Sequence, residues 1–275
     1  MARIIVDALE FSHHRTPILK GINITIEPRT VLGILGQNGS GKTTLLNCIR
    51  AEYTPTAGTV SAVDFSEDAV DDKRDLNGIV DIRRFTERER SRIMAVVEQN
   101  SLQTFPFTVT ETVMMGRYAR TGILEDDDSD IAYDCMEETG VIGFADRNVN
   151  ELSGGEWRRV MIAQALAQEP EVLLLDEPTL HLDVNHQFGL MDLCKHVAAT
   201  GRAVAVVTHD LEIAARYCDK IAVMDRGKII SVGTPEETVT TDMIRRIFHM
   251  ESKVGYDPDL NGIAVKLIRR VDNDE

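Results

Sequence analysis

The stretch that decides the fold begins at Val31, where Val31-Leu-Gly-Ile-Leu35 runs directly into Gly36-Gln37-Asn38-Gly39-Ser40-Gly41-Lys42-Thr43. The first five residues are typical of a buried strand, and the next eight fit the pattern G-x-x-x-x-G-K-[ST] of a phosphate-binding loop, or P-loop. The glycines of such a loop let backbone N–H groups converge on phosphate oxygens, at the positive end of the helix that follows. Lys42 adds a positive charge between the β and γ phosphates, Thr43 offers a hydroxyl ligand for Mg²⁺, and Thr44 contributes its backbone.

The rest of the chain predicts an α/β fold around that strand. Apolar, β-branched segments recur at residues 22–26, 93–97, 172–176, 204–208 and 221–224, and most of them are separated by helical stretches. This alternation is typical of a parallel sheet with helices on both faces. Asp225-Arg-Gly-Lys228, between two apolar segments, predicts a hairpin turn.

Three segments differ from this pattern. Residues 104–150 have helical periodicity without a good strand, which predicts an inserted helical subdomain. Residues 61–76 are acidic and without periodicity, so a surface loop is expected there. The tail after residue 240 starts helically, with Met243, Ile244, Ile247 and Phe248, and ends in the strand-like Ile263-Ala-Val-Lys-Leu-Ile268; the sequence predicts no function for it.

Composition bounds the class of protein. The chain has 275 residues, 43% of them hydrophobic and 27% charged, which fits one large globular domain or two modest ones and excludes disordered and fibrous classes. No apolar run reaches the ~18 residues of a membrane-spanning helix. Asp7 interrupts the start of the chain before the apolar part of a secretory signal forms, so the cytosol is the expected compartment.

The net charge of −15 comes mostly from residues 64–75, with six acids and two bases, and residues 125–138, with eight acids and no base. Such runs are typical of solvated surface more often than of a docking patch, and they weigh against binding to duplex DNA. The four cysteines (Cys48, Cys135, Cys194 and Cys218) form no C-x-x-C pair. Buried free thiols are therefore expected, in place of disulfides or a zinc site.

A second phosphate element follows the apolar segment Val172-Leu-Leu-Leu, which ends in Asp176-Glu177. Asp176 then lies at the carboxyl end of a strand, where open α/β sheets bind ligands, and is the expected partner of Mg²⁺, directly or through water. Glu177 is placed to orient or deprotonate a water molecule in line with the γ phosphate. An apolar run ending in Asp-Glu is common, so this interpretation depends on the P-loop upstream.

The sequence Leu152-Ser153-Gly154-Gly155-Glu156 precedes a long amphipathic stretch. Ser153 and Glu156 satisfy the capping box S-x-x-E, which by itself predicts only a well-capped helix. A helix N-terminus with two bare glycines is also an anion site that another surface can approach closely. The two interpretations are compatible.

With the P-loop, Leu-Ser-Gly-Gly-Glu and Asp176-Glu177-Pro178 in this order, the chain resembles an ATP-binding cassette (ABC) ATPase over residues ~3 to ~240. The resemblance implies ATP and Mg²⁺ as cofactors and a dimer of two copies. In that dimer Ser153, Gly154, Gly155 and Glu156 of one subunit contact the nucleotide held by the P-loop of the other. Its implied fold is a RecA-like core (residues 1–103 and 157–240) with a helical subdomain (about 104–156), a small antiparallel β portion and an extension (241–275).

The same resemblance gives roles to isolated residues. Gln99, in Val-Val-Glu-Gln99, corresponds to the Q-loop and is implied in catalysis and metal binding, Asp183 corresponds to the D-loop, and His209 to the switch histidine. His209 follows a strand, where a neutral imidazole can bridge the γ phosphate and the attacking water. His13 occupies the position of the aromatic residue that stacks on adenine, with Phe11 facing the core; imidazole stacks less extensively.

Two further positions depart from the family pattern without removing a phosphate donor. Glu98 stands where proline is frequent, and Glu156 stands where glutamine is frequent.

The segment Phe105-Pro-Phe-Thr-Val109, followed by Val113-Met-Met-Gly-Arg117, is either subdomain core or a partner groove. It resembles the ATPases of importers for iron chelates (ferric siderophores), haem and cobalamin. That resemblance implies two permease subunits, a substrate-binding protein reached indirectly, no nucleic acid, and a peripheral place on the cytoplasmic face of the membrane. The alternatives are a soluble ABC ATPase outside transport, a binding module without activity, and the ATPase of an exporter. The cargo is not predictable from this chain.

Overall fold

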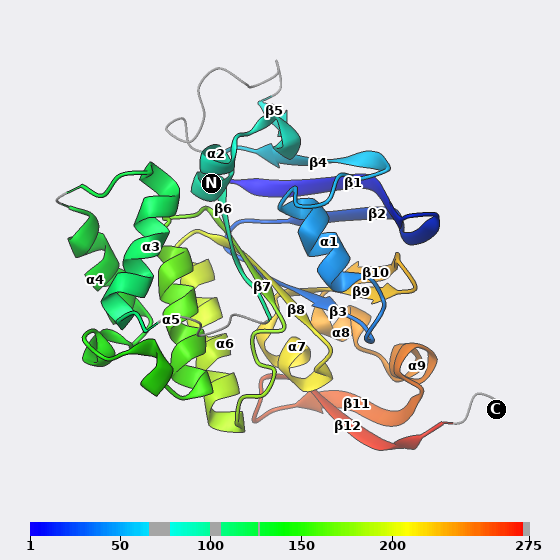
Figure 1. The fold of residues 1–275 in the computed structure, drawn as a ribbon. Helices are drawn as coiled ribbons and strands as arrows, with labels where there is room; N and C mark the ends of the chain where they lie inside the picture. Colours follow the sequence, from blue (N-terminus) through cyan, green and yellow to red (C-terminus); the bar gives the residue numbers. More distant parts are fainter. Residues whose placement is uncertain (66–77, 100–105, 126, 272–275) are drawn as a thin grey trace.

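A computed structural model describes residues 1–65, 78–99, 106–125 and 127–271, and its centre is a six-stranded sheet (Figure 1). The strand order is β10-β9-β3-β8-β7-β6; β9, β3, β8, β7 and β6 run parallel, and β10 pairs antiparallel with β9. These strands are β3 (Val31–Leu35), β6 (Met94–Val97), β7 (Val172–Asp176), β8 (Ala203–Thr208), β9 (Lys220–Asp225) and β10 (Lys228–Gly233). The predicted parallel α/β sheet and the hairpin turn before Lys228 are both confirmed.

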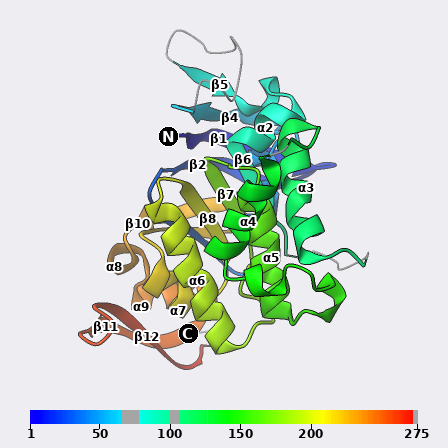
Figure 2. The same cartoon turned by 90° about the vertical axis from the view of Figure 1, so that its left-hand side faces the viewer.

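The central strands are apolar throughout because both faces of this sheet are buried. Side chains alternate along each strand, so Leu173 and Leu175 pack into one hydrophobic cluster while Val172 and Leu174 pack into another. The first cluster joins the sheet to helices α3 to α7, and the second joins it to α1 and an antiparallel sheet. Figure 1 shows α1 on one side of the sheet and α3, α4, α5 and α6 grouped on the other, and Figure 2 shows these four helices from their own side.

The small antiparallel portion is a four-stranded sheet in the order β2-β1-β4-β5. Its strands are β1 (Arg3–His13), β2 (Thr16–Ile26), β4 (Ala57–Val63) and β5 (Ile79–Asp81). The loop predicted over residues 61–76 is wrong at 61–63, which belong to β4. Ala62 pairs with Ile4 of β1 and is fully buried, so pairing and burial hold this acid-flanked end in the sheet. Residues 66–76 of that prediction lie outside the described residues.

The helical part is formed by α3 (Val109–Thr121), α4 (Asp128–Glu138) and α5 (Gly154–Leu166), with short turns η3 (Ile142–Phe144) and η4 (Val149–Glu151). Arg117 ties these helices together from a buried position. Its Nε donates to Oδ1 of Asp128 (2.6 Å), and its Nη1 donates to the Ala167 carbonyl (2.8 Å) and to Glu169 (2.7 Å). Of the acids on α4, Asp130, Asp134 and Glu137 are exposed as predicted, whereas Asp128 is buried against Arg117.

The remaining helices are short apart from α6. They are α1 (Lys42–Ile49), α2 (Glu87–Ile93), α6 (Val184–Ala199), α7 (Leu211–Tyr217), α8 (Pro235–Thr238) and α9 (Thr241–Met243), with turns η2 (Ile82–Arg84) and η5 (Ile244–Phe248). The tail continues as the hairpin β11 (Met250–Asp257) and β12 (Gly262–Arg270). Its helical start and final strand are confirmed. Ile244, Ile247 and Ile263 share the buried cluster of the main sheet, and the domain boundary near residue 240 stays a prediction.

Two simpler expectations can be compared with the structure. The four cysteines are free and buried, and burial raises the pKa of Cys194 to about 12 and that of Cys48 to about 11. Within the part of the chain that the structure describes, no helix has the length and apolar character needed to cross a membrane.

Candidate functional site

Four neighbouring strands of the main sheet each end in a residue or loop that the sequence singled out. β3 leads into the P-loop, β8 into His209, β7 into Asp176 and Glu177, and β6 into Gln99. The four strands are adjacent and parallel, so their carboxyl ends meet at one edge of the sheet. Open α/β sheets bind ligands at this edge. Residues separated by more than 170 positions in the chain thereby lie around one cavity.

The P-loop backbone has the conformation that phosphate binding requires. Gly41 caps the N-terminus of α1 with φ of 103°. This is a left-handed backbone conformation that residues other than glycine adopt only with strain. A Cβ on Gly36 would lie 2.4 Å from the Met224 carbonyl oxygen, so only glycine fits between the loop and β9. The loop is also held from outside, because the Gly227 N–H donates to the Ser40 carbonyl (3.0 Å).

Lys42 and Asp176 lie buried below this loop. Burial lowers the pKa of Lys42, and the charges of Glu177 and Asp176 oppose that shift. Burial disfavours the charged form of Asp176 as well, and it therefore raises the pKa of this carboxyl. The hydrogen bond from Thr43 opposes the shift, and the charge of Glu177 adds to it. The Lys42 ammonium donates to the carbonyls of Gly36 (2.7 Å) and Gln37 (3.0 Å). One lysine and two carboxylates are thus held together beneath the loop.

The donor set suits a hard divalent cation. Among the described residues, Oδ1 of Asp176 is buried without a hydrogen-bond partner, and so is Oγ of Ser40 in the P-loop. An unpartnered carboxylate oxygen beside the Thr43 hydroxyl is the kind of ligand that Mg²⁺ prefers. The residues therefore fit the metal that the sequence predicts. Thr43, Asp176 and Gln99 would hold it, and when bound it would neutralise charge on the phosphates.

Glu177 has the strained backbone often found at functional sites. Its φ is +46°, unusual for a residue with a side chain, and its N–H donates to the Val207 carbonyl of β8 (3.0 Å). Nδ1 of His209 lies 3.3 Å from Oε1 of Glu177. The Glu177 side chain is only 12% exposed, whereas that of His209 is 45% exposed. The backbone of Glu177 is therefore held between two strands, and its carboxylate lies beside the His209 imidazole.

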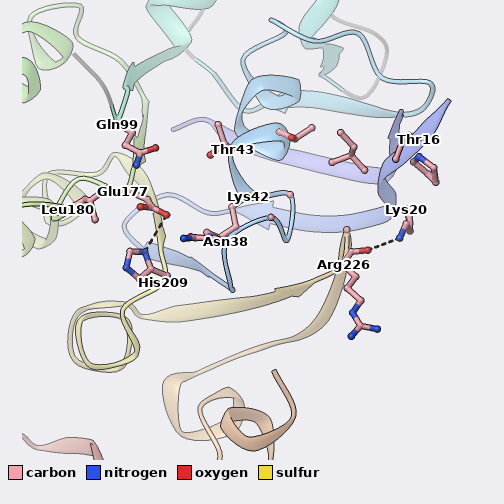
Figure 3. A pocket seen from close by; sticks show the side chains of 16 residues that line it. Thr16, Lys20, Asn38, Lys42, Thr43, Gln99, Glu177, Leu180, His209 and Arg226 are labelled. Atoms are coloured by element: carbon pink, nitrogen blue, oxygen red, sulfur yellow. Dashed lines mark hydrogen bonds and ion pairs between the residues drawn. The ribbon is translucent and has the colours of Figure 1, made fainter. Parts of the chain in front are cut away.

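These groups surround a cavity of about 920 Å³. Of the predicted residues, those that line it are Asn38, Gly39, Gly41, Lys42, Thr43, Thr44, Gln99, Glu177 and His209. Figure 3 shows Gln99, Glu177 and His209 on one side, Lys42 and Thr43 in the middle, and Thr16, Lys20 and Arg226 on the other. The cavity is large enough for a nucleotide, since ligand pockets commonly measure ~300–1,000 Å³.

The far side of the cavity was missed by the sequence analysis. Lys20 donates from its N–H to the Gly227 carbonyl (2.8 Å) and from its ammonium to the Arg226 carbonyl (2.9 Å). The β9–β10 turn is thereby joined to β2 beside the P-loop. The only sequence signal was the turn itself, and nothing in the sequence places that turn next to Lys20.

Other predicted residues lie away from this cavity lining. His13 lies at the exposed end of β1, with its ring edge-on to His14 (centroids 4.5 Å apart). Phe11 packs against the core and stacks on Tyr53 (5.1 Å). Gly36 and Ser40 support the loop from behind, and Gln37 borders a smaller hollow with His209.

The Leu-Ser-Gly-Gly-Glu segment forms the N-terminus of α5. The predicted capping box is present, because the Glu156 N–H donates to Oγ of Ser153 (3.3 Å) and the Ser153 N–H donates to Oε2 of Glu156 (2.7 Å). Asp183 caps α6 and pairs with Nδ1 of His186 (2.8 Å). The His186 ring lies against Gly155, where an added Cβ would come within 2.4 Å of it. Residues 152–156, called the signature from here on, and Asp183 of the D-loop are thus adjacent within one chain.

A P-loop at the head of a parallel sheet, with an acid pair and a histidine at neighbouring strand ends, defines a P-loop nucleoside triphosphatase. The model of the ABC transporter family matches residues 19–180. The chain belongs to this family, and the relatives described next are named ATP-binding proteins.

Curated relatives cover most of the chain. It is 39% identical over 262 residues to the cobalamin import ATP-binding protein BtuD of Halobacterium salinarum, covering 94% of this chain and 62% of that protein. It is 38% identical over 251 residues to the hemin import ATP-binding protein HmuV of Gloeobacter violaceus, covering 88% of this chain and 86% of that protein. The chain therefore spans about three fifths of the cobalamin relative.

Solved structures share the fold. CbiO1 of Clostridium perfringens, described as part of the ABC transporter complex CbiONQ, matches with a TM-score of 0.72 at 29% identity, over 88% of this chain and 92% of its own. The ADP conformation of another ABC transporter cassette matches with a TM-score of 0.73 at 23% identity, over 88% and 95%. The second likeness concerns the fold alone.

Proposed function

We propose that this chain is the ATP-hydrolysing subunit of an ABC importer that takes up an iron complex (ferric siderophore or haem) or cobalamin through a separate permease. The convergence of the P-loop, Gln99, Glu177 and His209 on one cavity carries the ATPase part of the proposal. The relatives named for hemin and cobalamin import support the importer part.

In the proposed reaction, Lys42 and the P-loop N–H groups hold the β and γ phosphates of ATP. Glu177 accepts the proton of the attacking water, and His209 holds that water against the γ phosphate. The bond between the γ phosphorus and the β–γ bridging oxygen breaks, which leaves ADP and inorganic phosphate. The fixed carboxylate of Glu177 favours this role because its position costs no reorganisation during the reaction.

The proposed active unit contains two copies of the chain. Ser153 and Gly154 are exposed, Glu156 is half-exposed and Gly155 is buried, and none of the four lines the chain's own nucleotide cavity. The positive end of α5, which they form, fits the γ phosphate bound to a second copy. His13 is retained in this proposal as the adenine contact, through the exposed end of β1.

The exposed face of α3 and the residues after it offer the surface for a permease. Val109 and Val113 of this helix are fully buried, whereas Phe107, Met115 and Tyr118 are exposed. The buried face belongs to the core of the helical part, and the exposed face is the one that we propose for a partner. Met115 and Tyr118 are three residues apart on one helical face, and Ile123 and Leu124 extend the exposed apolar surface beyond the helix. We assign this face to the permease, on the cytoplasmic side of the membrane.

Affinity purification from native membranes tests the proposal. The tagged chain, extracted in mild detergent, should recover a polytopic permease, together with a substrate-binding protein whose ligand identifies the cargo. Tyr118→Asp should reduce permease recovery, because it places a charge in an apolar interface. Tyr256→Asp is the matched control, since Tyr256 is similarly exposed (66% against 60%) but lies on β11.

Two outcomes would contradict the importer. Recovery of ribosomes, nucleic acid or the chain alone would favour an ABC ATPase outside transport. Recovery of a permease without any substrate-binding protein would favour an exporter.

A further inference from the structure

One buried arginine connects two parts of the proposed site that are far apart in the sequence. Arg158 lies one turn into α5, directly after the signature segment, and is 8% exposed. Its Nη1 donates to the Glu98 carbonyl (2.7 Å), and its Nη2 donates to the Gln99 carbonyl (3.0 Å). The planar guanidinium therefore spans two consecutive peptide groups at the end of β6.

Glu98, the first of these two residues, is also held by helix α1. Arg50, the C-terminal cap of the P-loop helix α1, donates from Nη1 to Oε1 of Glu98 (2.5 Å). Glu98 stands where proline is frequent in the family, and it gives Arg50 a carboxylate to bind. The segment at Glu98 and Gln99 thus joins α1 on one side to α5 on the other.

The planar guanidinium of Arg158 can hold two peptide groups in place, which the ammonium of a lysine does less well. The donors of the guanidinium are arranged in a fixed plane, so they hold both carbonyls in one relative orientation. Burial lowers the pKa of Arg158, and the Asp176 carboxylate opposes that shift. If the two carbonyls moved without Arg158, the buried guanidinium would lose its acceptors, which is costly. The carbonyls and Arg158 are therefore expected to move as a unit.

We infer that Arg158 is a positioning residue that makes Gln99 and the signature helix α5 move together when nucleotide binds. Gln99 lines the nucleotide cavity, whereas the first turn of α5 is the part proposed to reach a second copy. A movement of Gln99 at the nucleotide site of one copy then moves the signature of the same copy, which in the proposed dimer contacts the nucleotide of the second copy. This inference rests on the nucleotide site and the two-copy unit of the proposed function.

Two neighbours of Arg158 on α5 make this inference testable: Trp157 as a fluorescent probe of the helix, and Arg159 as a control position. Trp157, the single tryptophan, directly precedes Arg158 and packs partly buried against the core. Arg159 follows it on the same helix, but its Nη1 donates to the Thr139 carbonyl (3.2 Å) within the helical part. Arg159→Gln therefore removes one arginine from α5 without touching Glu98 or Gln99.

The experiment compares the full-length wild type with Arg158→Gln, Arg158→Lys and Arg159→Gln. Three quantities are measured: binding of radiolabelled ATP by equilibrium dialysis, the change in Trp157 fluorescence on adding Mg·ATP, and the kcat and KM of ATP hydrolysis. We expect Arg158→Gln to bind ATP normally, to lose the fluorescence change, and to lose about tenfold to hundredfold in kcat, the range expected of a misplaced reacting group. Arg158→Lys should recover part of both losses, and Arg159→Gln should match the wild type.

Each other outcome decides against the inference. If Arg158→Gln keeps the wild-type fluorescence change and kcat, Arg158 is only a packing residue. If Arg158→Gln does not fold, Arg158→Lys gives the answer, because a lysine with full response and rate would show that the guanidinium is unnecessary. If the wild type binds ATP without any change in Trp157 fluorescence, the inference is overturned but the proposed function is not. A wild type that binds no ATP removes the proposed function as well.

Discussion

At the scale of a residue, the backbone of Glu177 decides where its side chain lies. Its positive φ, its N–H bond to β8 and the adjacent His209 fix one carboxylate orientation. Such strain persists only where the surrounding structure enforces it. The two parallel strands β7 and β8 provide that enforcement, so the position depends on the sheet and not on a flexible loop.

Glu177→Gln should preserve ATP binding and reduce kcat by about a hundredfold or more, because the amide keeps the shape but accepts no proton. Phosphate release and ATP affinity are the quantities to measure. Glu212→Gln, an exposed acid in the first turn of α7, serves as the control and should retain the wild-type rate. Substantial turnover in Glu177→Gln would contradict the assignment of the base.

At the scale of elements, α5 and α6 meet through a glycine and a histidine. Gly155→Ala should lower the free energy of unfolding by about 1 to 3 kcal/mol, because the new methyl group overlaps the His186 ring. Urea denaturation of Gly155→Ala, His186→Ala and the double variant forms a mutant cycle. The double variant should be less destabilised than the two single effects added together. Simple additivity would show that the two residues do not press on each other.

The link between α3 and α4 predicts a pH dependence of stability. Burial raises the pKa of Asp128, but the Glu125 N–H and the Arg117 guanidinium lower it further, so the net shift is downward. A lowered native pKa means that the unfolded chain binds more protons, so this contribution is complete above pH ~4 and is lost as pH falls through the native pKa. Asp128→Asn should flatten the acid side of a stability–pH curve, and an unchanged acid side would contradict this role.

The sequence predicts elements best where one local pattern is sufficient. The strands that end at Leu35, Asp176 and Thr208 are apolar up to their last residues, because both faces of the sheet are buried, and the sequence predicts them directly. β1 was missed since one of its faces is exposed and Ala8, at φ of +44°, interrupts its pairing. Residues before and after Asp64 were assigned to a loop from their charge, although the preceding residues pair with β1.

Site residues divide in the same way. Lys42, Glu177 and His209 each directly follow or lie within a recognisable local sequence. Lys20 and Arg158 act through backbone carbonyls of distant residues, at Gly227 and Gln99, and no local pattern records such a contact. Every residue has a backbone carbonyl, so any residue type can be the acceptor in such a hydrogen bond. The sequence therefore does not indicate which residue is the partner.

For the whole molecule, the net charge of −15 predicts that salt stabilises the fold. Like charges repel more in the compact state, and raising KCl from about 0.05 M to about 0.5 M shortens the range of that repulsion. Thermal unfolding across this range should show a rising Tm. The variant with Asp130→Asn, Asp134→Asn and Glu137→Gln, exposed on α4, should show a smaller rise. A Tm independent of salt would mean that the acids are locally compensated.

The turn at Gly227 has a consequence for how the molecule is made. The nucleotide cavity needs Thr16 and Lys20 from early in the chain, and Arg226 and Gly227 from late in it. A ribosome delivers these residues in order, and domains generally fold during synthesis from the N-terminus. The P-loop therefore emerges long before the turn that supports it, and a growing chain has no finished cavity until residue 227 has cleared the exit tunnel. We expect ATP to stabilise a chain that extends past residue 227, but not a chain that ends before it.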